Sequence, residues 1–151
     1  MSKSSAGNVE QSRCLSVLSQ APTSEVKQFA DSLIPELGQI EVLQNRTGLA
    51  MLPMQDPVQG TTFYLGEVLL AEAHVSLVDH RVEGYAACLG RDVEHALAIA
   101  LVDAANAAEL AQEAIADFVT AQAARLEATD AHLLRQVEAT RVEMETFEWQ
   151  L

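Results

Sequence analysis

Glycine and proline are distributed unevenly along this chain. All seven glycines and all four prolines lie at or before Gly90, and residues 91–151 contain neither type. Both residue types interrupt helices and mark turns. The chain therefore divides into a first part with frequent breaks, residues 1–90, and a second part without them, residues 91–151. We therefore predict short helices and strands before Gly90, and helix after it.

Two helices are predicted at the start of the chain. The first, Val9–Ala21, has an apolar stripe and ends where a proline follows, since the residue before a proline avoids the helical region. Thr23 or Ser24 can cap a second helix. This helix should run to about Leu37, because Gly38 stands where a C-terminal cap is expected.

The middle of the chain predicts an antiparallel meander of about four strands, because apolar or alternating segments are separated by turn residues. The predicted strands are Ile40–Gln44, Leu49–Leu52, Thr62–Val78 and Val82–Leu89. A turn through residues 45–48 is predicted to join the first two strands. A hairpin turn at Asp79–His80 is predicted to join the last two.

The second part of the chain predicts a long alanine-rich helix and a further helix. Asp92 is a suitable N-cap for the first of these, in which apolar residues recur at helical spacing as far as Ile115. The last helix, capped by Thr129 or Asp130, is predicted to project as an arm. The predicted fold class is therefore α+β, with N-terminal helices, the meander, the alanine-rich helix and a C-terminal helical arm.

We divide the chain into a flexible N-terminus at residues 1–8, a core domain at residues 9–128 and the arm at residues 129–151. Alanine supplies much of the apolar fraction of 49%. Because alanine buries little area, the core is predicted to be thin. A homodimer of the isolated chain, formed through the arm and the alanine-rich helix, is a further prediction.

The formal net charge of −13 argues against two classes of partner. Nucleic-acid backbones require clustered Lys and Arg, and anionic membranes repel an acidic surface. No apolar run approaches the roughly 18 residues that span a membrane, and Met1–Asn8 lacks the apolar segment of a secretory signal. We expect a cytoplasmic protein. Its acidity indicates either simple solubility or a basic protein partner.

The densest group of ionisable residues is Arg91, Asp92 and His95. One interpretation is an anion site at a helix N-terminus, where free N–H groups favour negative charge. The other is that Asp92 caps the helix and its own carboxylate fills that site. His95 and Asp103 share a helical stripe, but the rise of eight residues separates them by about 12 Å, which excludes a dyad within the helix.

Glu67 is a carboxylate in an otherwise apolar stretch. It is interpreted either as a catalytic carboxylate or as a surface residue at the edge of a strand. Glu72 and His74 share one face of a strand, but two ligands are too few for a metal site. Cys14 and Cys88 lie far apart and are interpreted as reduced core residues. We predict no catalytic residue, metal or cofactor. Glu67, Arg91, Asp92, His95 and Asp103 remain candidate anion or partner contacts.

Several short motifs follow one another in a recognisable order and spacing. They are Thr47-Gly48-Leu49, Phe63-Tyr64-Leu65-Gly66-Glu67-Val68, Gly84-Tyr85, Gly90-Arg91-Asp92, His95-Ala96 and Ala100-Leu101-Val102-Asp103-Ala104. In this order they resemble the G subunit of carbon–phosphorus lyase, the PhnG family. The resemblance extends over most of the chain.

The resemblance implies a bacterial protein of phosphonate degradation that joins the H, I and J subunits of carbon–phosphorus lyase. It implies that the G, H and I subunits, with the L protein, form ribose 1-phosphonate 5-triphosphate from ATP and an alkylphosphonate. On this basis the chain is an accessory subunit of an enzyme complex, without activity of its own. The alternatives are a self-standing enzyme that uses Arg91, Asp92 and His95 on a phosphorylated substrate, and a generic helical interaction module.

Overall fold

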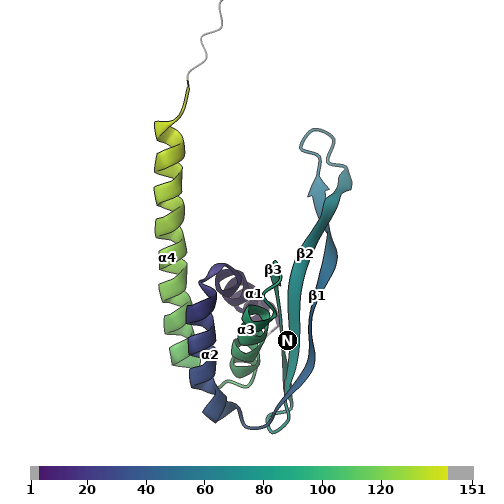
Figure 1. Ribbon diagram of the computed structural model, residues 1–151, viewed down its shortest axis with the longest axis vertical. Coiled ribbons are helices and arrows are strands. Elements are labelled where there is room, and N and C mark those ends of the chain that lie inside the picture. The colour runs from purple at the N-terminus through teal and green to yellow at the C-terminus, as the bar shows by residue number, and fades with distance from the viewer. Residues whose placement is uncertain (1–3, 143–151) are drawn as a thin grey trace, which may run out of the picture.

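The computed structural model describes residues 4–142, with side chains from residue 11 onward. It has the predicted α+β fold, with four helices and one sheet within these residues (Figure 1). The elements in chain order are α1 (Ser4–Gln20), α2 (Thr23–Leu37), β1 (Ile40–Gln55), β2 (Thr62–Leu77), β3 (Val82–Leu89), α3 (Val93–Ala107) and α4 (Gln112–Ala139).

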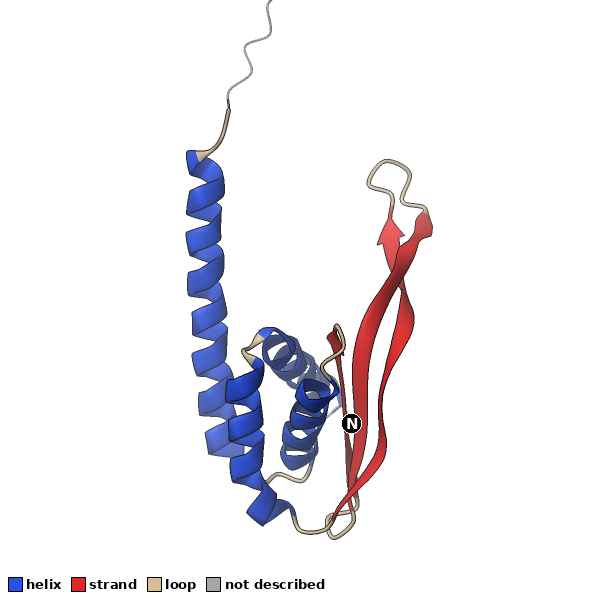
Figure 2. Cartoon of the chain, viewed as in Figure 1, coloured by secondary structure: helices blue, strands red, loops and turns tan. Residues whose placement is uncertain are grey.

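The sheet has three antiparallel strands in the order β1-β2-β3. β1 pairs with β2 along almost its whole length, whereas β3 pairs only with the Leu70–Leu77 part of β2. The remaining parts of β1 and β2 therefore extend beyond the sheet as a two-stranded ribbon, which Figure 2 shows in red. We refer to residues 48–69 as the ribbon.

The predicted turn at residues 45–48 is wrong, because β1 runs through these residues, and this gives three strands in place of about four. The cause lies in cross-strand contacts. Gln44 and Arg46 both donate hydrogen bonds to Oε1 of Glu72 on β2, over 2.9 Å and 2.6 Å. Such pairs across a ladder stabilise an extended strand. The predicted hairpin turn after Leu77 is confirmed.

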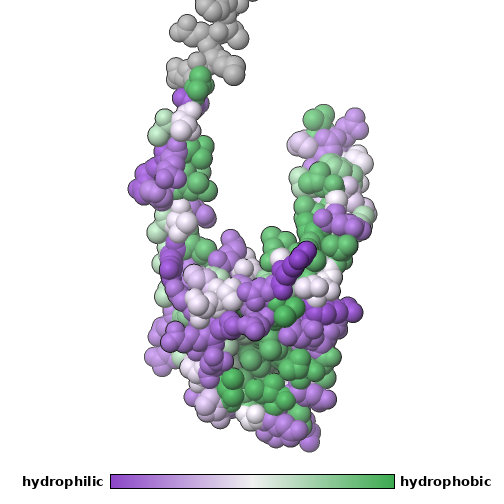
Figure 3. Space-filling view, in the orientation of Figure 1, coloured by the Kyte–Doolittle hydropathy of each residue, from purple (hydrophilic) through white to green (hydrophobic). Residues whose placement is uncertain are grey.

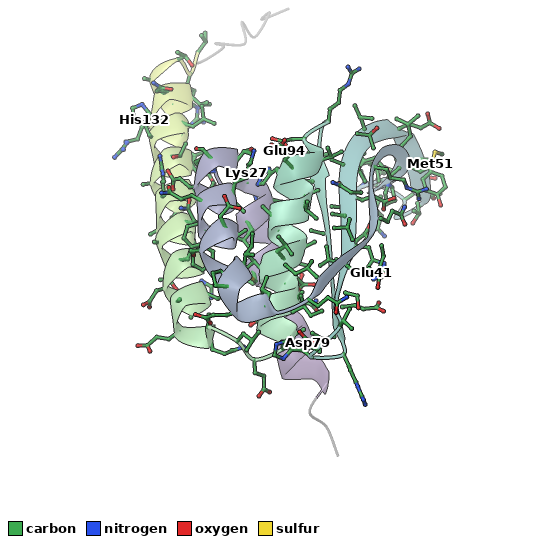
Figure 4. The ribbon with its side chains drawn as sticks, turned by 60° about the horizontal axis from the view of Figure 1, so that its bottom comes forward. Lys27, Glu41, Met51, Asp79, Glu94 and His132 are labelled. Atoms are coloured by element: carbon green, nitrogen blue, oxygen red, sulfur yellow. The ribbon has the colours of Figure 1, made fainter. Side chains whose placement is uncertain are left out.

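The core lies between one face of the sheet and α3. β2 alternates as the sequence predicts, with Ala71, Ala73, Val75 and Leu77 buried and the residues between them partly exposed. Ten residues of α3 are buried. α2 packs against the side of α3, where Lys27 of α2 and Glu94 of α3 point toward one another and form an ion pair (Figure 4).

The helix boundaries near the N-terminus differ in two ways from the prediction. α1 begins at Ser4, before the predicted start at Val9. α2 begins at Thr23, but Pro22 occupies the N-cap position and no side chain caps the helix, so the predicted capping role of Thr23 or Ser24 is wrong. Gly38 does end α2, with a φ of 71°.

The alanine-rich segment forms two helices, because the chain breaks between Ala107 and Gln112. Glu109 and Ala111 adopt left-handed conformations at this break. α4 then continues without interruption past Thr129 and Asp130. The prediction that a new helix starts there, capped by either residue, is therefore wrong. The break redirects the chain, and α4 packs beside α2 through the stacked rings of Phe29 and Phe118, whose centroids lie 4.2 Å apart.

The second half of α4 leaves the body of the molecule. Gln122 is buried and donates to Glu25 of α2 over 2.6 Å, but every residue from Glu127 to Val142 is exposed. Of the predicted arm at residues 129–151, residues 143–151 lie outside the described part of the chain, and from here on we refer to residues 127–139 as the arm. The arm and the ribbon project to the same side of the molecule and give it the shape of a U (Figure 1).

Two further findings bear on compartment and chemistry. Within residues 4–142, no helix is both long and apolar enough to cross a membrane. Cys14 and Cys88 are both buried thiols, as predicted. Burial raises the pKa of the Cys88 thiol, and the nearby Asp92 carboxylate adds to this effect. Burial and the raised pKa both disfavour the thiolate of Cys88, which is the reactive form of a cysteine.

Candidate functional site

The carboxylate of Asp92 caps α3, as the sequence predicts. Its Oδ1 accepts the backbone N–H of His95 over 2.9 Å. This hydrogen bond is the main reason that the pKa of Asp92 lies below its ordinary value, and a side-chain hydrogen bond from Thr23 acts in the same direction. The Asp92 carboxylate therefore occupies the place that an external anion would take at this helix N-terminus.

His95 and Arg91 do not converge with Asp92 on a common point. The His95 ring is buried, and its Nε2 lies 3.0 Å from the backbone oxygen of Leu18 in α1. Because a carbonyl oxygen only accepts, this nitrogen donates, and the bond ties α3 to α1. Arg91 is exposed, and its side chain makes no hydrogen bond or ion pair within the described part of the chain.

Asp103 is buried, and both of its carboxylate oxygens are hydrogen-bonded. Oδ1 accepts from Nε2 of Gln11 over 2.8 Å, and Oδ2 accepts the backbone N–H of Tyr85 over 3.0 Å. The side chain thus joins α3 to α1 and to β3. His95 and Asp103 have separate partners, in agreement with the exclusion of a dyad within the helix.

The outer face of the sheet, opposite the helices, carries a hydrogen-bonded polar network centred on Glu72. Besides its bonds from Gln44 and Arg46, Glu72 accepts from the hydroxyl of Tyr85 over 2.8 Å. The Arg46 bond, followed by that of Tyr85, lowers the pKa of Glu72. The bond to Glu72 also raises the pKa of Tyr85. Glu72 therefore joins all three strands of the sheet.

His74 lies beside this network and bonds to a different carboxylate. Its Nε2 is 2.8 Å from Oε2 of Glu83 on β3. Across residues 4–142, no group of three or more His, Cys, Asp or Glu side chains is arranged to hold a metal ion.

Glu67 lies on the ribbon, far along the chain from the other four candidates, and its register partner on β1 is Met51. It is exposed, and no hydrogen bond or ion pair of its side chain is found within the described residues. It is the only charged residue in the two strand segments of the ribbon, residues 48–55 and 62–69. The five predicted residues thus do not form a single site.

Large apolar side chains are exposed on both projections of the U. On the ribbon they are Leu49, Leu52, Met51, Met54, Val58, Phe63, Tyr64 and Leu65, and on the arm they are Leu133, Leu134 and Val137. Leu49 retains 66% of its surface and Leu134 retains 68%. Figure 3 shows a deep hollow between the projections, with hydrophobic patches on the sides that border it.

This apolar surface was not identified from the sequence, although a signal for it exists. The predicted strand Thr62–Val78 is about twice as long as its predicted neighbour Val82–Leu89. Half of the longer strand is therefore left without a neighbouring strand at the edge where Val82–Leu89 pairs with it. Residues 48–69 also contain only two charged residues, Asp56 and Glu67. An unpartnered apolar hairpin can be inferred from these two observations together.

One small pocket borders α1, α3 and α4. Arg13, Asn106 and Gln112 supply polar groups around it, and its volume is about 140 Å³. Ligand sites for small molecules commonly have volumes of about 300–1,000 Å³. Two other, more open depressions have volumes of about 320 Å³ and 490 Å³, and none of the five candidate residues lines any of the three. The exposed apolar surface of the ribbon and the arm is therefore the stronger candidate for a functional site.

A family model described as phosphonate metabolism protein PhnG matches residues 10–148. A search of curated proteins found no match to the chain. The matched residues include the sheet, the ribbon and the whole of α4.

Proposed function

Since the chain belongs to the PhnG family of phosphonate metabolism proteins, we propose that it is an accessory subunit of a carbon–phosphorus lyase complex. In this proposal it acts in the cytoplasm with the H, I and J subunits and the L protein. It supports the formation of ribose 1-phosphonate 5-triphosphate from ATP and an alkylphosphonate, while other chains carry the reacting groups.

The observation that carries this proposal is the exposure of apolar side chains on the ribbon and the arm. Both elements extend away from the core, so neither can bury these side chains within the monomer. Extended apolar surfaces of this kind mark protein interaction sites. A subunit that is enclosed by partners would cover both elements on assembly.

The hydrogen-bond partners of the ionisable residues also support an accessory role. Asp92, His95 and Asp103 are each bound to groups of the fold itself, through a helix cap and two ties between elements. These bonds give the residues a structural role that requires no substrate. The buried position of the His95 ring also argues against the alternative of a self-standing enzyme.

The composition favours protein partners over self-association. With 22 acidic and nine basic residues, two copies of the chain repel one another, whereas a basic partner is attracted. The predicted homodimer was to form through the arm and the alanine-rich helix. Because most of α3 is buried inside the monomer, this helix is not available for a contact between two copies. Such a dimer would have to form through the arm of α4.

Co-expression with the H, I and J subunits tests the proposal. With an affinity tag on the I subunit, this chain should elute with the other subunits in a constant ratio through a sizing column. Assembly of H, I and J while this chain elutes free would contradict an accessory role. Turnover of ATP and an alkylphosphonate by the purified chain alone would support the enzyme alternative in its place.

A further inference from the structure

We propose that the face of the ribbon that carries Glu67 is a docking surface for one kind of partner. The partner is a protein segment that is mainly apolar and presents a single Lys or Arg side chain to Glu67. This inference rests on the proposed function and specifies which surface the complex uses and what chemistry the partner provides there.

The strand register places Glu67 on the helix-facing side of the sheet. Ala71 is fully buried against the helices, and Glu67 lies four residues before it on β2. Because side chains alternate between the two faces of a strand, both point to the same side. The register shift nearest to this segment lies between Leu52 and Pro53, beyond Met51, so the alternation is intact here.

The same face carries apolar neighbours from β1. Leu49 is paired with Leu69 and Met51 with Glu67, so these four side chains share one face. Leu49 and Met51 are both more than half exposed. Figure 4 shows Met51 on the ribbon, away from the body formed by the helices. A partner that covers Leu49 and Met51 therefore also covers Glu67.

Glu67 differs from the other carboxylate of the ribbon in lacking an internal partner. Asp56 accepts the backbone N–H groups of Val58 and Gln59 over 3.0 Å and 3.2 Å, which fixes the loop at the tip. Glu67 makes no comparable bond within residues 4–142. Removing an ionised carboxylate from water without a cation is costly. A Lys or Arg of the partner compensates this cost most effectively, since hydrogen bonds between ionised groups are stronger than neutral ones.

A second copy of the chain does not meet this requirement. Packing the same face of two copies together would bury two Glu67 carboxylates while neither pair of ribbon strands supplies a Lys or Arg, and each copy already carries a net charge of −13. Like charges brought together in an interface oppose association. The charge pattern therefore favours a different chain that is basic at this point.

A carboxylate on an exposed strand can also serve only to prevent aggregation. The two roles respond differently to charge reversal. A charge that only prevents aggregation works with either sign, so the Glu67→Lys variant would keep this protection. A charge that pairs with a partner cation is effective only when negative, so Glu67→Lys would place two cations together.

A competition experiment distinguishes these roles. The wild-type chain and the Glu67→Lys variant are co-expressed with the H, I and J subunits, and the complex is isolated through a tag on the I subunit. Intact mass spectrometry then gives the ratio of the two chains. Glu41→Lys is the matched control, because Glu41 is an exposed carboxylate of β1 outside the ribbon (Figure 4).

We expect the wild-type chain to exceed Glu67→Lys in the complex by about 30-fold or more, since an unmatched buried charge typically has an effect of this size. Glu67→Asp should be incorporated at close to the wild-type level, and Glu41→Lys should compete equally. Thermal unfolding of the isolated variants should match that of the wild type.

Equal incorporation of Glu67→Lys would overturn the inference while leaving the proposed function intact. Absence of the wild-type chain from the complex would overturn both. A dimer of the purified chain that Leu49→Ser abolishes, with no effect of Leu49→Ser on the complex, would assign this face to a second copy and would also overturn the inference.

Discussion

Gly84 determines how closely the sheet can approach α3. A Cβ atom at this position would lie 2.2 Å from the backbone oxygen of Ala100 and 2.7 Å from the Cβ of Ala104. Both contacts are far shorter than van der Waals separation. The small residues that the sequence places in α3 and at Gly84 therefore act together, because each allows the other backbone to come near.

Gly84→Ala is predicted to lower the free energy of unfolding by about 1–3 kcal/mol or more, because the added methyl group must push α3 away from β3. Urea denaturation measures the change. Gly66→Ala is the matched control, since a Cβ there meets nothing within 4 Å, and its effect should stay within about 0.5 kcal/mol. Equal effects of the two substitutions would contradict this account of the contact.

Asp92→Ala is predicted to destabilise the chain by about 1 kcal/mol at neutral pH through loss of the helix cap. The pKa of Asp92 is lowered from 3.8 in the folded chain, so its stabilising contribution is fully present above that value. This contribution disappears as the pH falls through the lowered pKa. The difference in unfolding free energy between wild type and Asp92→Ala should therefore shrink in acid.

Asp92→Asn provides the control for this pH dependence. Asparagine can cap a helix without a titrating charge, so Asp92→Asn should exceed Asp92→Ala in stability by an amount that does not change with pH. A difference between wild type and Asp92→Ala that persists unchanged down to pH 2 would show that the ionised cap is not its source.

Among the elements, those governed by local patterns could be predicted from the sequence. The alternation from Ala71 to Leu77 identified a strand that is buried on one side, and Asp92 and Gly38 identified two helix ends. For the strand, the alternation of apolar and polar residues is itself a local pattern, although α3 provides the contact that buries it. The two helix ends follow from one side chain or one backbone conformation.

The elements that were mispredicted depend on contacts between distant segments. The Asn-Arg-Thr-Gly sequence at residues 45–48 is typical of a turn, but the bonds from Gln44 and Arg46 to Glu72 hold it in a strand. The break before α4 contains no glycine or proline, and the contact of Phe118 with Phe29 fixes the direction of the helix after it. Neither pairing can be read from local spacing.

The two halves of α4 are predicted to respond differently to mutation. Ile115→Ala should cost about 2–4 kcal/mol of unfolding free energy, because Ile115 is buried in the core. Leu133→Ser and Leu134→Ser should each change it by less than about 0.5 kcal/mol, because both side chains are exposed on the arm. Urea denaturation of the isolated chain tests this contrast, and a large loss at Leu133 would show that the arm is packed in solution.

At the scale of the whole molecule, the sequence indicated candidate residues but not their grouping. Glu67 was recognisable because it interrupts an apolar stretch. Its exposure, however, depends on the ribbon, which carries it beyond the three-stranded part of the sheet. Arg91, Asp92 and His95 are adjacent in sequence, but the helix geometry directs His95 inward and leaves Arg91 exposed. The division into residues 1–8, 9–128 and 129–151 stays a prediction.

The central claim is that the ribbon and the arm are covered by partner subunits. Hydrogen–deuterium exchange of the chain, alone and in complex with the H, I and J subunits, tests it most directly. We predict that exchange slows in residues 48–69 and 127–139 on assembly, while Val82–Leu89, within the three-stranded part of the sheet, changes little. Unchanged exchange in both projections, with new protection confined to β3, would contradict the claim.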